Sequence, residues 1–142
     1  MTAQRRRRKR ILVDPLANRR HIGRRGHFPR LHAVANRSVR GKVDAAVSRL
    51  GGRAQGRAGH LSTAQCCDAL VSEVPDVDIL VNNVGVFQPA DFVDASDEVW
   101  KKHWQINVMS GVRLSRAYAK AMAARNRGRI ILISSESLQY PG

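Results

Sequence analysis

Five polar side chains in this sequence have the types and the positions that could take part in chemistry. They occur in three places along the chain: Asn82 and Asn83, then Asn107, then Ser134 and Ser135. A Ser hydroxyl can donate a hydrogen bond to a substrate oxygen, and an Asn amide can both donate and accept. Gly85 follows the first pair, and a glycine lets a ligand approach the backbone closely. Each pair also fits an ordinary turn, where Ser, Asn and Gly are common.

Two apolar runs would position the paired residues. Residues 77–81 lead into Asn82, and residues 129–133 lead into Ser134. Both runs are unbroken rather than alternating, which is typical of strands buried on both faces of a parallel sheet. Ligands of such sheets bind outside the carboxyl ends of the strands. The pattern therefore predicts that both polar pairs lie at a ligand-binding edge.

A helix is predicted between the two strands. Ser96 is its expected N-cap, residues 97–127 have helical spacing of apolar side chains, and Gly128 is the expected C′ residue. The order strand, helix, strand is one βαβ unit, which is right-handed in nearly all proteins.

The motifs in this unit resemble those of the short-chain dehydrogenase/reductase family. The segments that carry the resemblance are NNVG at 82–85, WQINVMSG at 104–111 and GRIILISSES at 128–137. Asn107 and Ser135 are 28 residues apart, as the Asn and Ser of that family typically are. The resemblance covers about residues 43–142.

The resemblance implies a doubly wound, Rossmann-like fold that binds NAD or NADP and moves a hydride between the nicotinamide and a small carbonyl or alcohol substrate. It implies that Ser135 hydrogen-bonds the substrate oxygen and that Asn107 holds a water in a proton relay. The remaining matched positions lie on the cofactor side: Asn82, Asn83 and Gly85, with Arg37 matching a basic residue that favours NADP in some members.

Three departures from the family pattern accompany this match. The family's glycine-rich turn is expected near residues 8–16, where the sequence has no glycine, and His60 stands where an Asp is usual. The family's acid/base Tyr and its Lys would fall beyond Gly142, because Tyr140 is too close to Ser135 and no Lys follows it. We therefore expect an incomplete sheet, a fragment of the enzyme that is inactive as it stands, and no cofactor binding measurable by calorimetry.

Charge divides the chain at residue 42. Residues 1–42 hold 14 Lys and Arg and one acid, Asp14, whereas residues 43–142 hold 11 basic and 10 acidic residues. Blocks of like charge without helical or strand periodicity are usually disordered. The sequence thus predicts a disordered basic segment over 1–42 and a partial NAD(P)-binding domain over 43–142.

The basic segment has three competing interpretations. It is a polyanion-binding arm, an Arg-rich transit peptide, or an out-of-frame reading of GC-rich DNA, and the last explains why the glycine turn is missing. The first gives the alternative function, a non-enzymatic protein that binds nucleic acid or another polyanion through this arm.

Shorter elements complete the predicted domain. A helix is expected at 41–52, a strand around 53–61, and a helix over 63–74 with a capping box of Ser62 and Gln65. Cys66 and Cys67 are adjacent, which favours reduced thiols in a cytoplasmic protein. The histidines lack metal-site spacing, and no apolar run is long enough for a membrane span. Members of the family are commonly dimeric or tetrameric, and one helix of their usual interface falls near 100–126, whereas its partner helix would follow the missing Tyr. The resemblance thus allows a homo-oligomer and leaves the oligomeric state open.

Overall fold

The computed structural model describes residues 9–13, 31–37, 40–50 and 54–134, and they form an α/β unit around a parallel sheet. The sheet has five strands in the order β3-β2-β1-β4-β5. All four neighbouring pairs run parallel. The strands are β1 (Lys9–Val13), β2 (Leu31–Arg37), β3 (Ala54–Ala58), β4 (Ile79–Asn82) and β5 (Arg129–Leu132).

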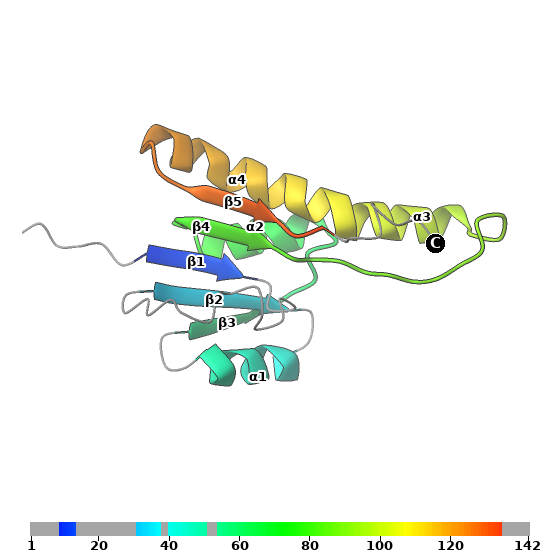
Figure 1. Cartoon of the computed structure of the whole chain (residues 1–142), viewed down its shortest axis with the longest axis horizontal. Coiled ribbons are helices and arrows are strands. Elements are labelled where there is room, and N and C mark those ends of the chain that lie inside the picture. Colours follow the sequence, from blue (N-terminus) through cyan, green and yellow to red (C-terminus); the bar gives the residue numbers. More distant parts are fainter. Residues whose placement is uncertain (1–8, 14–30, 38–39, 51–53, 135–142) are drawn as a thin grey trace, which may run out of the picture.

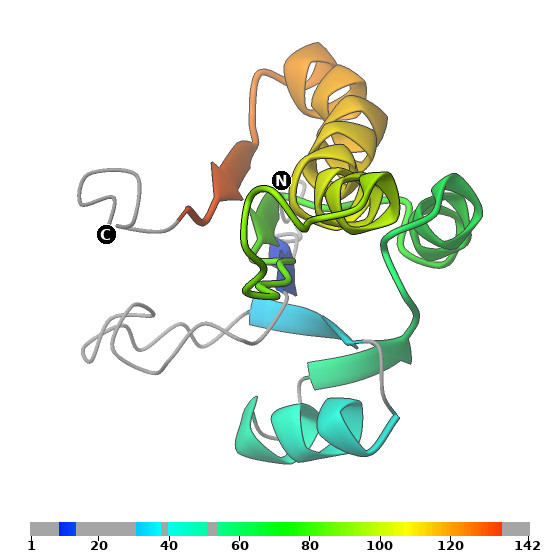
Figure 2. The ribbon, with the colours of Figure 1, turned by 90° about the vertical axis from the view of Figure 1, so that its right-hand side faces the viewer.

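Helices cover both faces of this sheet. The helical segments are α1 (Arg40–Leu50), α2 (Ala64–Glu73), α3 (Asp97–His103), the π-helix η1 (Trp104–Met109) and α4 (Ser110–Ala124). Helix α1 packs against β2 and β3, whereas α4 packs against β4, β5 and α2. Figure 2 shows α1 apart from the layer that α2 and α4 form. The strand order reverses direction between β1 and β4, so the predicted doubly wound α/β fold is confirmed.

Two stretches of the basic segment form strands in the centre of the sheet, which differs from the expected disorder. In β1, Ile11 pairs with Ile79 of β4 on one side and with Ala33 of β2 on the other. A strand needs only about five residues, so a short apolar run inside basic sequence is enough. Helix α1 also begins at Arg40, before the predicted boundary. Residues 1–8, 14–30, 38 and 39 lie outside the described residues, and the boundary at residue 42 stays a prediction.

The core lies between α2, α4 and β4 (Figure 1). Its buried residues are Leu61, Cys67, Leu70, Val74, Val77, Leu80, Leu114, Tyr118 and Met122. The Tyr118 hydroxyl donates a hydrogen bond of 2.8 Å to the Val74 carbonyl, which satisfies the polar end of an otherwise apolar side chain. Burial raises the pKa of Tyr118 to about 12, because the phenolate would lose its hydration.

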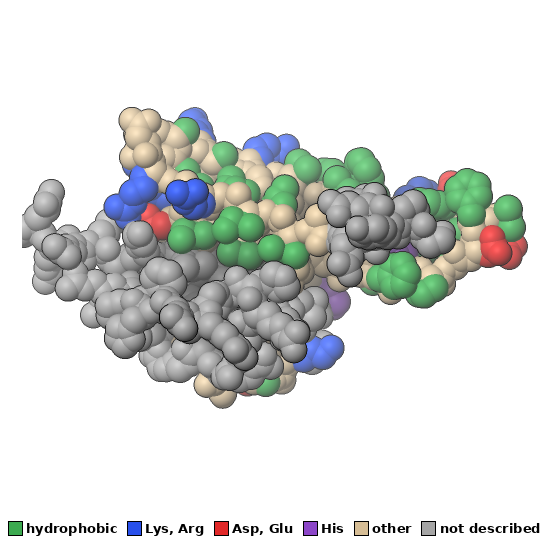
Figure 3. Space-filling model, viewed as in Figure 1, with side chains coloured by type: hydrophobic (Ala, Val, Ile, Leu, Met, Phe, Trp, Pro, Cys, Tyr) green, Lys and Arg blue, Asp and Glu red, His purple; other side chains and the backbone are tan. Residues whose placement is uncertain are grey.

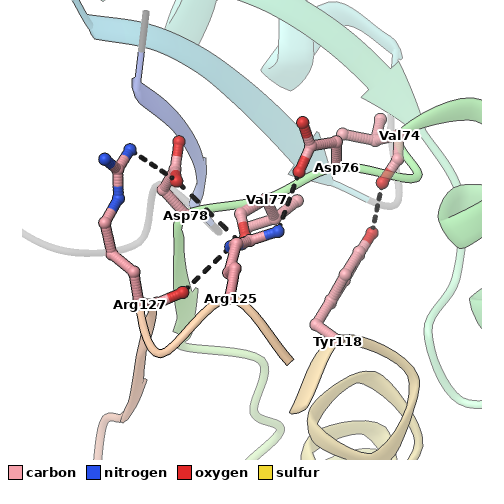
Figure 4. A network of polar contacts seen from close by, with 7 residues as sticks. All are labelled: Val74, Asp76, Val77, Asp78, Tyr118, Arg125 and Arg127. Carbon is pink, nitrogen blue, oxygen red and sulfur yellow. Dashed lines mark hydrogen bonds and ion pairs between the residues drawn. The ribbon is translucent and has the colours of Figure 1, made fainter. Parts of the chain in front are cut away.

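An arginine network closes the amino-terminal edge of the sheet (Figure 4). Arg125 donates to the Asp76 carboxylate at 2.9 Å and to the Val77 carbonyl. Arg127 donates to Asp78 at 3.1 Å, and its own carbonyl accepts from Arg125 Nε at 2.9 Å. The end of α4 is thereby tied to the segment that enters β4. These contacts lie at the edge opposite the carboxyl ends of the strands.

Strand β5 is exposed, which corrects the expectation that residues 129–133 are buried on both faces. All four of its residues are exposed, and 60% of the Leu132 surface is accessible. The strand is last in the sheet order and pairs with β4 alone among the described strands. Figure 3 shows its apolar side chains at the surface. By contrast, Leu80 and Asn82 of β4 are buried.

The ends of two helices also differ from prediction. Thr63, not Ser62, is the N-cap of α2, and its hydroxyl accepts from the Cys66 N–H at 3.2 Å. At the end of α4, Asn126 rather than Gly128 has the positive φ, at 47°. The Asn126 N–H bonds Ala123 and the Arg127 N–H bonds Met122, which is the Schellman pattern. Gly128 is needed for packing instead, since a Cβ there would lie 2.3 Å from Met122 Cγ.

Candidate active site

The carboxyl ends of β2, β4 and β5 bring the predicted site residues to one edge of the sheet. Asn82 ends β4 and stands opposite Leu132, the last residue of β5. The Asn82 carbonyl accepts from the Ile133 N–H at 2.9 Å, which extends the pairing by one residue. Ser134 follows and is exposed. Ser135 lies outside the described residues, so its predicted contact with a substrate oxygen stays a prediction.

Arg37 ends β2 at the same edge. The register pairs Ala35 of β2 with Val13 of β1, and Val13 with Val81 of β4, so Arg37 and Asn82 both lie just beyond that level. This backbone position suits a residue near the cofactor, and its predicted preference for NADP stays a prediction. The expected glycine turn does not fit the observed boundaries, because residues 9–13 form β1 and the connection after Val13 lies outside the described residues.

The Asn82 side chain is a buried amide whose oxygen accepts no hydrogen bond from the described residues. The residue is 6% exposed, and its Oδ1 has no hydrogen-bond partner among the described residues. Its Nδ2 lies against Gly111 at the start of α4, where an added Cβ would stand only 2.9 Å away. Gly111 therefore allows the helix to approach the end of β4 closely. A buried unpaired carbonyl costs free energy and often marks a functional position.

Asn107 binds the backbone that follows β4. Its Oδ1 accepts from the Val86 N–H at 2.7 Å, and its Nδ2 donates to the Val86 carbonyl at 3.0 Å. The Asn107 side chain thus forms the two hydrogen bonds with Val86 that a neighbouring strand would otherwise form. Gly85 is exposed beside it, with Asn107 Oδ1 at 3.7 Å from where a Cβ would be. The structure places Asn107 beside Gly85, a contact that the sequence did not predict, while the proton relay stays a prediction.

A second helix side chain, missed in the sequence, holds the same segment. His103 lies one turn before Asn107, and its Nε2 is 3.2 Å from the Gln88 nitrogen. Its Nδ1 is 2.8 Å from the Val99 carbonyl. From its place in the sequence, His103 was expected to pack on its helix rather than to bind anything. The four-residue spacing from Asn107 is the only signal that could have placed it on the same face of the helix.

Asn107 sits within the π-helix η1, which separates α3 from α4. Wide π-turns inside α-helices are rare and frequently occur at functional sites. The Ser110 hydroxyl donates to the Ile106 carbonyl at 2.6 Å and supports the chain where the helix narrows again. The predicted helix 97–127 is therefore present, but it contains this irregularity.

Metal chemistry has no support in the described part of the chain. Those residues contain no group of three His, Cys, Asp or Glu side chains that could hold a metal ion.

Cys66 and Cys67 are free, and burial raises the pKa of the Cys67 thiol. None of the helices in the described ranges is long and apolar enough to cross a membrane.

Comparison with known proteins agrees with this geometry. Residues 30–142 match the short chain dehydrogenase family, so the match begins before the expected residue 43. The chain is 44% identical over 81 residues to the uncharacterized oxidoreductase YvaG of Bacillus subtilis (strain 168), covering 57% of this chain and 31% of YvaG. It is 40% identical over 109 residues to the uncharacterized oxidoreductase YvrD of the same organism, covering 73% and 41%.

Solved structures show the same relationship. L-Sorbose reductase from Gluconobacter frateurii, complexed with NADPH and L-sorbose, superposes with a TM-score of 0.73 at 32% identity. The match covers 79% of this chain and 46% of that enzyme. The chain belongs to the short-chain dehydrogenase/reductase family. It spans about a third to two fifths of the length of the two curated relatives named above. These matches support the oxidoreductase prediction and give no support to the polyanion-binding alternative.

Proposed function

We propose that this protein is an NAD(P)-dependent short-chain oxidoreductase that transfers a hydride between the nicotinamide and a small carbonyl or alcohol compound. The observation that carries the proposal is the gathering of Asn82, Gly85 and Asn107 beside the point between β1 and β4 where the strand order reverses. In doubly wound folds, that crevice is where dinucleotides bind.

The described residues fit a nicotinamide cofactor at this edge. Gly85 presents exposed backbone, and the buried Asn82 amide has an unused acceptor close by. Asn82, Asn83 and Gly85 would hold the cofactor, with Arg37 beside the ribose that carries the extra phosphate of NADP. When bound, the nicotinamide supplies or accepts the hydride. NADPH in the related L-sorbose reductase supports this assignment of cofactor class.

Ser135 and Asn107 are the proposed groups on the substrate side. During carbonyl reduction, negative charge develops on the substrate oxygen, and a Ser hydroxyl aimed at that oxygen stabilises it by hydrogen bonding. Asn107 is held rigidly through Val86, which keeps it in place next to the edge. It supports the proton relay without touching the substrate.

Single substitutions test these roles in a form of the protein that carries the Tyr, the Lys and the glycine-rich turn of the family. Ser135→Ala should lower kcat/KM for NAD(P)H-dependent carbonyl reduction by roughly two to four orders of magnitude, or about 3 to 5 kcal/mol. Ser134→Ala is the matched control and should have much less effect, because neighbouring residues of an extended strand point to opposite faces. Asn107→Ala should be intermediate. A damaging Ser134→Ala with a silent Ser135→Ala would show that the assignment is off by one residue.

We also propose that the protein forms homo-oligomers in the cytoplasm. Trp100, Trp104, Val108 and Val112 are all exposed and follow one another at intervals of four residues. Such an apolar stripe on a helix commonly marks an interface between proteins. Two free cysteines suit a reducing compartment. Trp104→Glu should reduce the molar mass measured by light scattering, whereas the exposed Lys120→Glu should not.

A further inference from the structure

The segment that leaves β4 is hydrogen-bonded to helical side chains at two positions, Val86 and Gln88. This segment, Asn83–Gln88, is called the edge loop below. Asn107 bonds both backbone groups of Val86, and His103 contacts the backbone nitrogen of Gln88 at 3.2 Å. Lys102 adds a contact of 3.0 Å to the Gln88 side chain. The backbone groups next to Gly85 are therefore held by side chains rather than by a neighbouring strand.

The two contacts of His103 are both satisfied by one tautomer of the ring. The Val99 carbonyl can only accept, so the hydrogen of the ring must be on Nδ1, which lies 2.8 Å away. The Gln88 N–H can only donate, so Nε2 must be the acceptor. The tautomer with its hydrogen on Nδ1 satisfies both contacts. Both ring nitrogens are then occupied by the backbone, which leaves neither for a substrate proton or a metal ion.

We propose that His103 is a positioning residue for the edge loop and thereby for the cofactor. This inference rests on the proposed function, because it takes the edge loop as the surface that the cofactor meets. Asn107 fixes the loop at Val86, and His103 fixes its far end two residues later. Gly85 precedes the first of these points and presents exposed backbone. Release of Gln88 should therefore loosen the loop next to Gly85 while leaving the core unaffected.

Two substitutions at position 103 separate the hydrogen bond from the volume of the side chain. His103→Leu keeps the size and removes the acceptor. His103→Gln restores an acceptor, since its amide oxygen can reach the place of Nε2. Lys102→Met is the matched control, because it removes only the contact with the Gln88 side chain. A fourth variant, Gln88→Pro, removes the N–H donor and leaves the helix unchanged, so it serves if His103→Leu does not fold. Because proline has no amide hydrogen, exchange is then followed at Val86 of the same loop.

Amide hydrogen exchange provides the test that does not depend on activity. In His103→Leu, exchange at Gln88 should accelerate about tenfold, the effect of losing one net hydrogen bond, while Leu80 and Leu114 in the core keep their rates. His103→Gln should restore most of the protection, and Lys102→Met should leave it unchanged. Equal exchange at Gln88 in His103→Leu and the unsubstituted protein would overturn the proposal.

Steady-state kinetics test the link to the cofactor in a form of the protein that carries the family's Tyr, Lys and glycine-rich turn. His103→Leu should raise the KM for NAD(P)H several-fold more than it lowers kcat, because the chemical groups are untouched. The Gln variant should return the KM toward its original value. Faster exchange at Gln88 with an unchanged KM would refute the link to the cofactor. No NAD(P)H turnover in the unsubstituted form that carries the family's Tyr, Lys and glycine-rich turn would instead contradict the proposed function, and the exchange result would still decide whether His103 holds the loop.

Discussion

Replacing Gly111 by Ala tests the close approach of α4 to the end of β4. An added Cβ would stand 2.9 Å from Asn82 Nδ2 and 3.6 Å from Leu132 Cδ2. Asn82 is only 6% exposed, so its amide has little room to move away. Overpacking of this kind costs about 1 to 3 kcal/mol, whereas Ala gains about 1 kcal/mol over Gly in a helix. Gly111→Ala should therefore lower the free energy of unfolding by up to about 2 kcal/mol.

Gly41→Ala is the matched control, because Gly41 lies in α1 and an added Cβ meets nothing within 4 Å. It should be neutral or stabilise the protein by up to about 1 kcal/mol. Urea unfolding at constant m-value measures both changes.

The clash can be assigned to Asn82 by a double-mutant cycle. In the Asn82→Ala background the amide is absent. The loss of unfolding free energy caused by Gly111→Ala should then be smaller than in the original protein by about 0.5 to 2 kcal/mol. An equal cost in both backgrounds, or a Gly111→Ala variant as stable as Gly41→Ala, would refute the proposed packing.

Two further predictions concern the core and the arginine network. Burial raises the pKa of Tyr118 from its ordinary value of 10.0 to about 12 in the folded protein. The contribution of the protonated side chain to stability is therefore complete below pH 10 and is lost as the pH rises towards 12. The difference in unfolding free energy between the original protein and Tyr118→Phe should narrow by about 2 to 3 kcal/mol across that range, and a constant difference would contradict the burial argument. Arg125→Met should lower the free energy of unfolding by about 1 to 3 kcal/mol in urea, because Asp76 and the Val77 carbonyl each lose one donor, and the exposed Arg116→Met should lower it by under about 0.5 kcal/mol. Equal costs for the two arginines would contradict the network.

The βαβ unit could be predicted because its signals are local. Unbroken apolar runs end at Asn82 and near Ser134, and the helix between them has its expected N-cap, Ser96. The approach of Asn107 to Gly85 was not predicted, because the order of the motifs along the chain does not reveal contacts between them. Burial of β5 was wrongly predicted, because a sequence pattern does not reveal which strand lies at the edge.

Other features depend on tertiary contacts that the sequence does not display. Strand β1 has three apolar residues among basic ones, and its central place comes from its pairing on both sides. The π-turn of η1 and the bond between His103 and Gln88 depend on how the edge loop docks on the helix. Asn126 replaced the expected Gly128 as the residue with positive φ, because Asn also tolerates that conformation.

The most direct test of the central claim is to locate the cofactor on the protein by amide chemical-shift mapping. Isotope-labelled protein is titrated with millimolar NADPH and NADH, concentrations at which binding too weak for calorimetry still shifts amide signals, and with ATP as a control for attraction of phosphates to the basic segment. The account predicts shifts specific to the two nicotinamide cofactors at Asn82, Asn83, Gly85 and Gln88, with none at Asp76 or Arg127 on the opposite edge. Shifts confined to arginines of the first 42 residues and reproduced by ATP would contradict it and favour a polyanion-binding protein.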